Sequence, residues 1–214
     1  MYKIKRVQVW DIWIRIFHWA LVCFFVLAYI TGKNLDIIHS YAGYAIMALL
    51  TFRIVWGFIG STYARFTNFI YSPLTTHEYT ISLMRGEPKH YYGHNPLAAL
   101  LIFVMIFALI ATSFTGLKTQ GLKGEGLLAS NDTELVSRIK ASKEKQAHQI
   151  YYNYLEKEEK HYWQAAHMYA ANFTLFLIFV HLIGVIISST VHRENIMQSM
   201  VDGQKEPPID YDKN

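Results

Sequence analysis

The chain has 214 residues, of which 52% are hydrophobic, 15% aromatic and only 17% charged. An average soluble domain has about 25% charged residues, so this composition argues against an ordinary soluble domain. The net charge of +4 comes from basic residues that flank apolar runs, which favours membrane lipid rather than nucleic acid as their partner.

Four runs of the chain are almost free of charge, and they cover about residues 12–31, 37–59, 97–117 and 164–190. Each reaches the roughly 20 residues that a helix needs to cross a hydrocarbon core of ~30 Å. The first run contains Arg15 and His18 and lacks a small-x-small cleavage site, so we interpret it as a spanning helix rather than a signal peptide. The sequence therefore predicts an all-α integral membrane four-helix bundle that forms a single domain over 1–214. A soluble protein with a large buried helical core is the alternative.

Basic residues are concentrated before the first run and in the segment from about 60 to 95. By the positive-inside rule, both termini, this segment and the tail 193–214 are expected in the cytoplasm of a bacterium, and the chain in its inner membrane. Residues 118–162 are then expected in the periplasm, as a helical excursion that leads into the last spanning helix. The sequence HNPLAAL predicts Asn95 as the N-cap of the third spanning helix and Pro96 as its first residue. A short surface helix is expected over 75–86.

The ten histidines divide into two groups by their position relative to the apolar runs. An ionisable side chain inside a membrane helix is costly and usually faces the bundle interior. Six lie outside the runs or at their edges and are expected to be solvated: His77, His90, His94, His148, His161 and His192. Four lie inside the runs: His18, His39, His167 and His181.

The spacing of the four inner histidines predicts two ligand pairs. His167 and His181 are separated by about 21 Å along a helix axis and by roughly 40° around it, so they share a face with one imidazole in each leaflet. The early position of His18 in the first helix gives it the depth of His181, and His39 near the start of the second has the depth of His167. Two pairs at two depths fit two bis-histidine haems in the bundle core. A zinc site such as H-E-x-x-H needs both ligands within one turn and is excluded.

Four further residues are candidates for binding the same groups. Gly43 and Gly184 each lie about one turn after an inner histidine, where the absence of a side chain leaves room for a flat macrocycle. Glycine is also common at membrane helix interfaces for packing reasons alone. Arg15 and Arg53 lie near the expected cytoplasmic ends of the first two helices. They either pair with haem propionates or extend toward lipid phosphates, and both roles stay open.

Several sequence blocks resemble one known family. They are VWDIWIRIFHW, HSYAGY leading to FRIVWGFIG, RFTNFIYSP, GHNPLAAL and HLIGVIISSTVHRENIMQSMVDGQK, which together cover about residues 7–117 and 161–205. The chain thereby resembles the bacterial cytochrome b561 and nickel–iron hydrogenase b-type cytochrome family. Residues 118–160 depart from the family pattern, on the side where a partner would dock.

The resemblance implies a four-helix membrane protein with two non-covalent b haems in respiratory electron transport. Its expected role is electron transfer between the quinone pool and a redox partner, such as a hydrogenase or a c-type cytochrome. It would act as an electron-transfer protein or oxidoreductase subunit rather than as a stand-alone catalyst. Carried over residue by residue, the axial ligands fall on the same four inner histidines: His18, His39, His167 and His181.

Two other functions compete with this interpretation. One is a haem-free membrane transporter or proton conductor that uses the inner histidines as relays. Such a path would need acidic partners, and the apolar runs contain almost no Asp or Glu. The other is a haem-free structural anchor, which leaves four paired membrane histidines without a reason.

Overall fold

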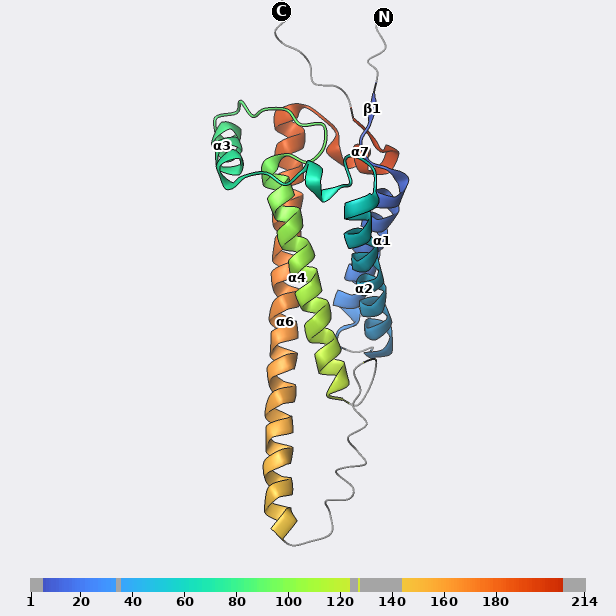
Figure 1. The fold of residues 1–214 in the computed structure, drawn as a ribbon, viewed down its shortest axis with the longest axis vertical. Helices are drawn as coiled ribbons and strands as arrows, with labels where there is room; N and C mark the ends of the chain where they lie inside the picture. The colour runs from blue at the N-terminus through green and yellow to red at the C-terminus, as the bar shows by residue number, and fades with distance from the viewer. Residues whose placement is uncertain (1–5, 34–35, 124–126, 128–143, 206–214) are drawn as a thin grey trace, which may run out of the picture. The chain divides into compact units, whose positions relative to one another are not determined.

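The computed structural model describes residues 6–33, 36–123, 127 and 144–205, and Figure 1 shows its helices. The chain forms two compact units. Unit 1 comprises Met1–Ile106 and Phe176–Asn214, and unit 2 comprises Phe107–Leu175. Part of the excursion expected over 118–162, at 124–126 and 128–143, and the end of the tail at 206–214 lie outside the described residues.

Two apolar helices, α1 (Ile12–Thr31) and α2 (Asp36–Ile59), pack along each other in unit 1. Neither contains proline, and each is long and apolar enough to cross a membrane. The α1 helix begins after Asp11, whose Oδ1 accepts a hydrogen bond from the Ile14 N–H at 2.9 Å. This N-cap fixes where the first spanning helix starts.

A short 3₁₀ helix, η1 (Phe66–Asn68), and a surface helix, α3 (Pro73–Met84), follow α2. Ser72 caps α3 by accepting a hydrogen bond from the Thr75 N–H at 3.1 Å, and Pro73 occupies the first helical position. The helix expected over 75–86 therefore begins slightly earlier than the sequence indicated.

The helices α4 (Pro96–Gly121) and α6 (Glu144–His192) each run through both units. The predicted N-cap is confirmed, because Asn95 Oδ1 accepts from the Ala98 N–H at 2.8 Å. The α4 helix continues past the expected end near 117, and α6 begins well before 164 because the residues ahead of it are themselves good helix formers. Within the described residues, α1, α2, α4 and α6 supply the four apolar helices of spanning length, which confirms the predicted all-α membrane architecture.

In unit 1, two short strands near the ends of the described chain pair with each other. After α7 (Ile196–Asp202), β2 (Gln204–Lys205) pairs antiparallel with β1 (Val7–Gln8). The Gly203 carbonyl also accepts hydrogen bonds from the Val9 and Trp10 N–H groups at 2.9 and 3.0 Å. Two-residue strands carry no hydrophobic pattern, so the sequence did not predict this pairing.

Candidate functional site

One predicted ligand pair lies within unit 1. His18 on α1 and His181 on α6 are both partly buried and interact electrostatically. The His18 ring packs edge-on against Trp19 at a centroid distance of 5.3 Å, and its Nδ1 is buried without a hydrogen-bond partner among the described residues. The structure therefore brings the first pair into one region and leaves one imidazole nitrogen unsatisfied there.

His39 is held by the neighbouring helix. Its Nδ1 lies 2.8 Å from the Ala28 carbonyl oxygen of α1. A carbonyl can only accept, so Nδ1 carries the proton and donates, which leaves the ring lone pair on Nε2. This is the tautomer that an imidazole needs to bind a metal through Nε2.

His167 is held in the same way in unit 2. Its Nδ1 donates to the Thr112 carbonyl of α4 at 2.9 Å, and Thr115 Oγ1 lies 3.3 Å from the same nitrogen. A Cβ added at Gly116 would lie only 3.0 Å from the His167 ring, so this glycine makes room for the imidazole. Thr112 and Gly116 were not predicted, because the register of α4 against α6 cannot be read from one sequence. His39 and His167 belong to different units, and their pairing stays a prediction.

The two glycines proposed to make room for a macrocycle both border open space. A Cβ added at Gly43 or at Gly184 would meet nothing within 4 Å. At Gly57, in contrast, an added Cβ would lie 2.1 Å from Phe66, so helix packing alone requires that glycine. Packing against the described residues therefore does not explain Gly43 or Gly184, and the space beside each of them is open to a ligand.

The two arginines contact the protein rather than extending away from it. Arg53 is only 4% exposed, donates to the Ala64 carbonyl at 3.1 Å and stacks its guanidinium over Phe66 at 4.6 Å. Of the two roles left open for Arg53, extension toward lipid phosphate is therefore wrong. Arg15 donates to the Val201 carbonyl, and its Nε is buried without a hydrogen-bond partner among the described residues.

The expectation that the outer histidines are solvated is wrong for His94 and for His90, whose side chain is only 17% exposed and lies against Glu194. The side chain of His148 lies outside the described residues. The His94 ring lies between the rings of Trp10 and Phe69, at centroid distances of 4.6 and 4.5 Å. Its burial, together with the positive charges of Arg53 and Lys205 and the presence of His181, lowers its pKa to about 3. The physical reason for the error is the chain-end pairing, which places Trp10 over the loop that precedes α4.

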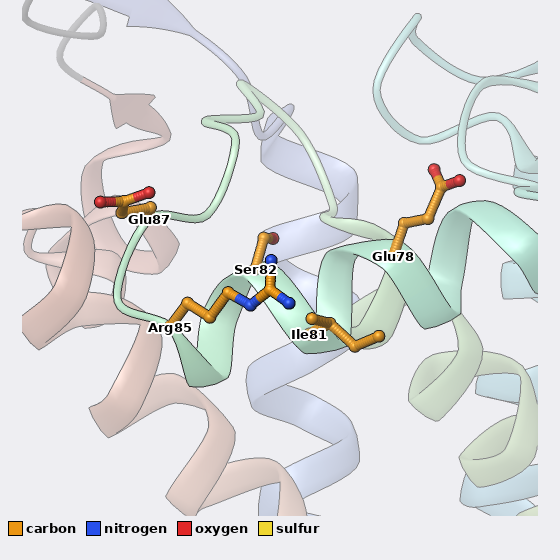
Figure 2. Close-up of a pocket in the computed structure, with 5 residues that line it drawn as sticks. All are labelled: Glu78, Ile81, Ser82, Arg85 and Glu87. Carbon is orange, nitrogen blue, oxygen red and sulfur yellow. The ribbon is translucent and has the colours of Figure 1, made fainter.

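Described residues of unit 1 line a cavity on its surface and another beside His94. A cavity of about 380 Å³ beside α3 is lined by Glu78, Ile81, Ser82, Arg85 and Glu87. Figure 2 shows Glu78 on the helix, Arg85 at its end and Glu87 in the loop that follows. This cavity contains none of the predicted site residues. A smaller cavity of about 220 Å³ lies beside His94 and is lined largely by aromatic rings, among them Tyr63, Phe69, Tyr71 and Tyr91.

The donor set fits a haem held by two imidazoles. Neutral imidazole is an axial ligand of haem iron, and membrane helices can supply it from facing positions. Two of the four inner histidines already have the proton on Nδ1, and both glycines next to predicted ligands border open space. Among the described residues, no group of three His, Cys, Asp or Glu is placed to hold a bare metal ion.

Comparison with known proteins points in the same direction. The sequence model of the family described as prokaryotic cytochrome b561 matches residues 9–203. A protein of Bradyrhizobium diazoefficiens named as a probable Ni/Fe-hydrogenase B-type cytochrome subunit is 23% identical, over 94% of this chain and 86% of its own length. Proteins with the same name from Rhizobium leguminosarum bv. viciae and Cupriavidus necator are 25% and 22% identical, over 94% and 95% of this chain and 89% and 88% of their own lengths. No solved structure matches the chain significantly.

Proposed function

The chain belongs to the prokaryotic cytochrome b561 family, and from that premise we propose that it is a di-haem membrane cytochrome that passes electrons between the quinone pool and a redox partner. Membership makes it a multi-pass b-type membrane cytochrome whose function is electron transfer. The number of haems, the quinone and the partner are the proposed parts. The observation that carries the proposal is the set of four histidines inside helices of spanning length.

We assign His18 and His181 to one haem and His39 and His167 to the other. A bound haem supplies one-electron chemistry at its iron, and the protein tunes it through axial ligands, hydrogen bonds and burial. The Ala28 and Thr112 carbonyls would fix the His39 and His167 rings and raise their basicity as ligands. Gly43 and Gly184 would give the macrocycles room, and Arg15, with its unsatisfied Nε, is the better placed of the two arginines for a propionate.

Different observations support the quinone and the redox partner in this proposal. A quinone head group is a flat ring with carbonyl acceptors, and the cavity beside His94 has aromatic walls and a buried imidazole. The relatives' names mention a Ni/Fe hydrogenase, so a hydrogenase is the partner we propose, with a c-type cytochrome as the other candidate. The family model runs from 9 to 203 across both units, which supports treating 1–214 as one membrane domain.

The ligand assignment is tested by the spectrum of the purified protein. Dithionite reduction is expected to produce the α-band of b-type haem, and a pyridine haemochrome assay to give two haems per chain. Replacing His18 or His181 by alanine should remove one spectral component, and replacing His39 or His167 the other, because an axial position lost in the membrane core has no substitute ligand. His77→Ala on α3 is the matched control and should keep both.

Each outcome has a defined meaning. A protein without haem would overturn the proposed function. Loss of the same component from His18→Ala and His39→Ala would overturn the pairing alone. Anaerobic addition of a benzoquinol to the oxidised protein should reduce the haem, and failure of this arm with a normal dithionite spectrum would remove the quinone from the proposal.

A further inference from the structure

Two threonine hydroxyls connect α4 to α6 inside unit 2. Thr112 Oγ1 lies 3.0 Å from Thr174 Oγ1, and the side chain of Thr174 is fully buried. Thr174 follows His167 by seven residues, which is about two helical turns, so both side chains lie on the same face of α6. A polar contact therefore joins the two helices on the face of α6 that carries a proposed haem ligand.

Each of the two hydroxyls also has a partner in its own helix. Thr112 Oγ1 lies 2.8 Å from the Ala108 carbonyl oxygen, and Thr174 Oγ1 lies 2.9 Å from that of Ala170. Because a hydroxyl has a single proton, one threonine donates across to the other helix while its partner donates within its own. Removal of either hydroxyl leaves the remaining one with a carbonyl to donate to. What is lost is the connection between α4 and α6.

The backbone of Thr112 holds the proposed ligand directly. Its carbonyl accepts a hydrogen bond from His167 Nδ1–H at 2.9 Å and a second one from the Thr115 hydroxyl, also at 2.9 Å. Gly116, on the next turn, leaves room for the imidazole ring. Thr112 thus contacts α6 twice, through its side chain to Thr174 and through its carbonyl to His167.

These two contacts define the register of α4 against α6. A slide of one helix by one residue would move the Thr112 carbonyl by about 1.5 Å along the axis, which is enough to break its hydrogen bond with His167. The hydroxyl contact belongs to the same residue of α4 and opposes such a slide. The side chains of Thr112 and Thr174 are therefore placed to keep the carbonyl at Nδ1.

We propose that the contact between Thr112 and Thr174 positions His167 for its haem and keeps the midpoint potential of that haem lower than it would be without the contact. This inference rests on the proposed function. A hydrogen bond from Nδ1–H to a carbonyl raises the basicity of the imidazole as a ligand. A more basic ligand favours ferric over ferrous iron, and axial ligands with their hydrogen bonds are among the features that set haem potentials. Both threonines are positioning residues, because they act on His167 and not on the iron.

The test is a redox titration of the purified holoprotein, followed at the spectral component that is lost in His167→Ala. Thr112→Val and Thr174→Val each remove one hydroxyl and keep the shape of the side chain. Each should shift the potential of this haem to a more positive value, while the haem content and the potential of the other haem stay unchanged. Thr174→Ser restores the hydroxyl and should return the potential toward that of the wild type.

A matched control and a double variant separate positioning from general packing. Thr190→Val makes the same change at an exposed position of α6, where the hydroxyl donates to the Ile186 carbonyl of its own helix, and should leave both potentials unchanged. If the contact carries the effect, the double variant of Thr112 and Thr174 should shift the potential no further than either single variant, because both remove the same interaction.

Several outcomes would overturn the inference. Unchanged potentials in the single valine variants would do so, as would a shift to more negative values. Additive shifts in the double variant would show that the two hydroxyls act separately, and equal shifts of both haems would show a general loosening of the helices. Where one single variant does not assemble, the direction of the shift in the other decides. Absence of haem from the wild type would instead overturn the proposed function.

Discussion

At the residue scale, the surroundings of each imidazole decide which role it can take. The His39 and His167 rings donate Nδ1–H to carbonyls of the adjacent helix, which orients Nε2 for a metal. His94 lies between two aromatic rings and is kept neutral by burial. His90 shares a carboxylate with Lys205. The same residue type thus serves as a ligand candidate, as a packed ring and as the partner of a carboxylate.

The pKa of Asp11, the N-cap of α1, also depends on the surroundings of its carboxyl group. Burial alone would raise its pKa, but hydrogen bonds from the Ser61 hydroxyl, the Ile14 N–H and the Trp56 indole outweigh burial and lower the pKa below 3.8. A carboxyl whose pKa is lowered on folding stabilises the fold above its unfolded pKa. That contribution is lost as pH falls through the folded value.

We therefore expect Asp11→Ala to lower the free energy of unfolding by about 1–2 kcal/mol at neutral pH, as for the loss of an N-cap with added side-chain bonds. The difference from the wild type should shrink below about pH 4, because the wild-type carboxyl then becomes protonated. Thermal unfolding in detergent at two pH values measures both effects. Glu156→Ala, an exposed residue of α6, is the control and should change little. A difference that grows on acidification would contradict the assignment.

At the element scale, the short segment α7–β2 is hydrogen-bonded to α1 and to the residues that precede it. The Trp10 indole donates to Ser199 Oγ at 3.2 Å, and the Trp19 indole donates to the Met200 carbonyl at 3.2 Å. Gly203 ends α7 with a φ of 84° and accepts two backbone hydrogen bonds from the segment before α1. The segment thereby also positions Lys205, whose Nζ lies 3.4 Å from Glu194 Oε2.

Two glycines with positive φ allow the importance of these contacts to be measured. At Gly203 an added Cβ would lie 2.4 Å from the Gln8 side chain and 2.5 Å from the Trp10 carbonyl, whereas at Gly86, with a φ of 78°, nothing lies within 4 Å. Gly86→Ala should cost only the backbone strain of about 1–2 kcal/mol, and Gly203→Ala that strain plus a collision with backbone. Thermal unfolding and limited proteolysis of the C-terminal segment compare them. If both variants are destabilised equally, the contacts of Gly203 with the segment before α1 contribute nothing to stability.

At the scale of the whole molecule, the chain-end pairing constrains topology. Val7 pairs with Lys205, so the described chain ends lie on the same side of any membrane that the helices cross. An even number of spanning helices gives the same result. The concentration of basic residues before α1 and between α2 and α4 favours the cytoplasm as that side.

Reporter fusions test this orientation. Alkaline phosphatase fused after Asn214 should be inactive, because the enzyme folds only after export, and a fluorescent protein at the same point should be bright. Phosphatase inserted after Leu127, between α4 and α6, should be active. An active C-terminal phosphatase would contradict this orientation.

The sequence alone determined the number of spanning helices, the N-cap of α4 and the position of four histidines inside those helices. Hydrophobic runs, capping residues and polar residues within an apolar run are all local signals. The depth pairing placed His18 with His181, which the structure brings into electrostatic range. Only the tertiary structure decided that Arg53 is buried, that Gly116 makes room for His167, and that His90, Glu194 and Lys205 meet. These features depend on the register between helices and on pairing of the chain ends, and contacts between segments distant in the chain leave no periodic trace in a single sequence.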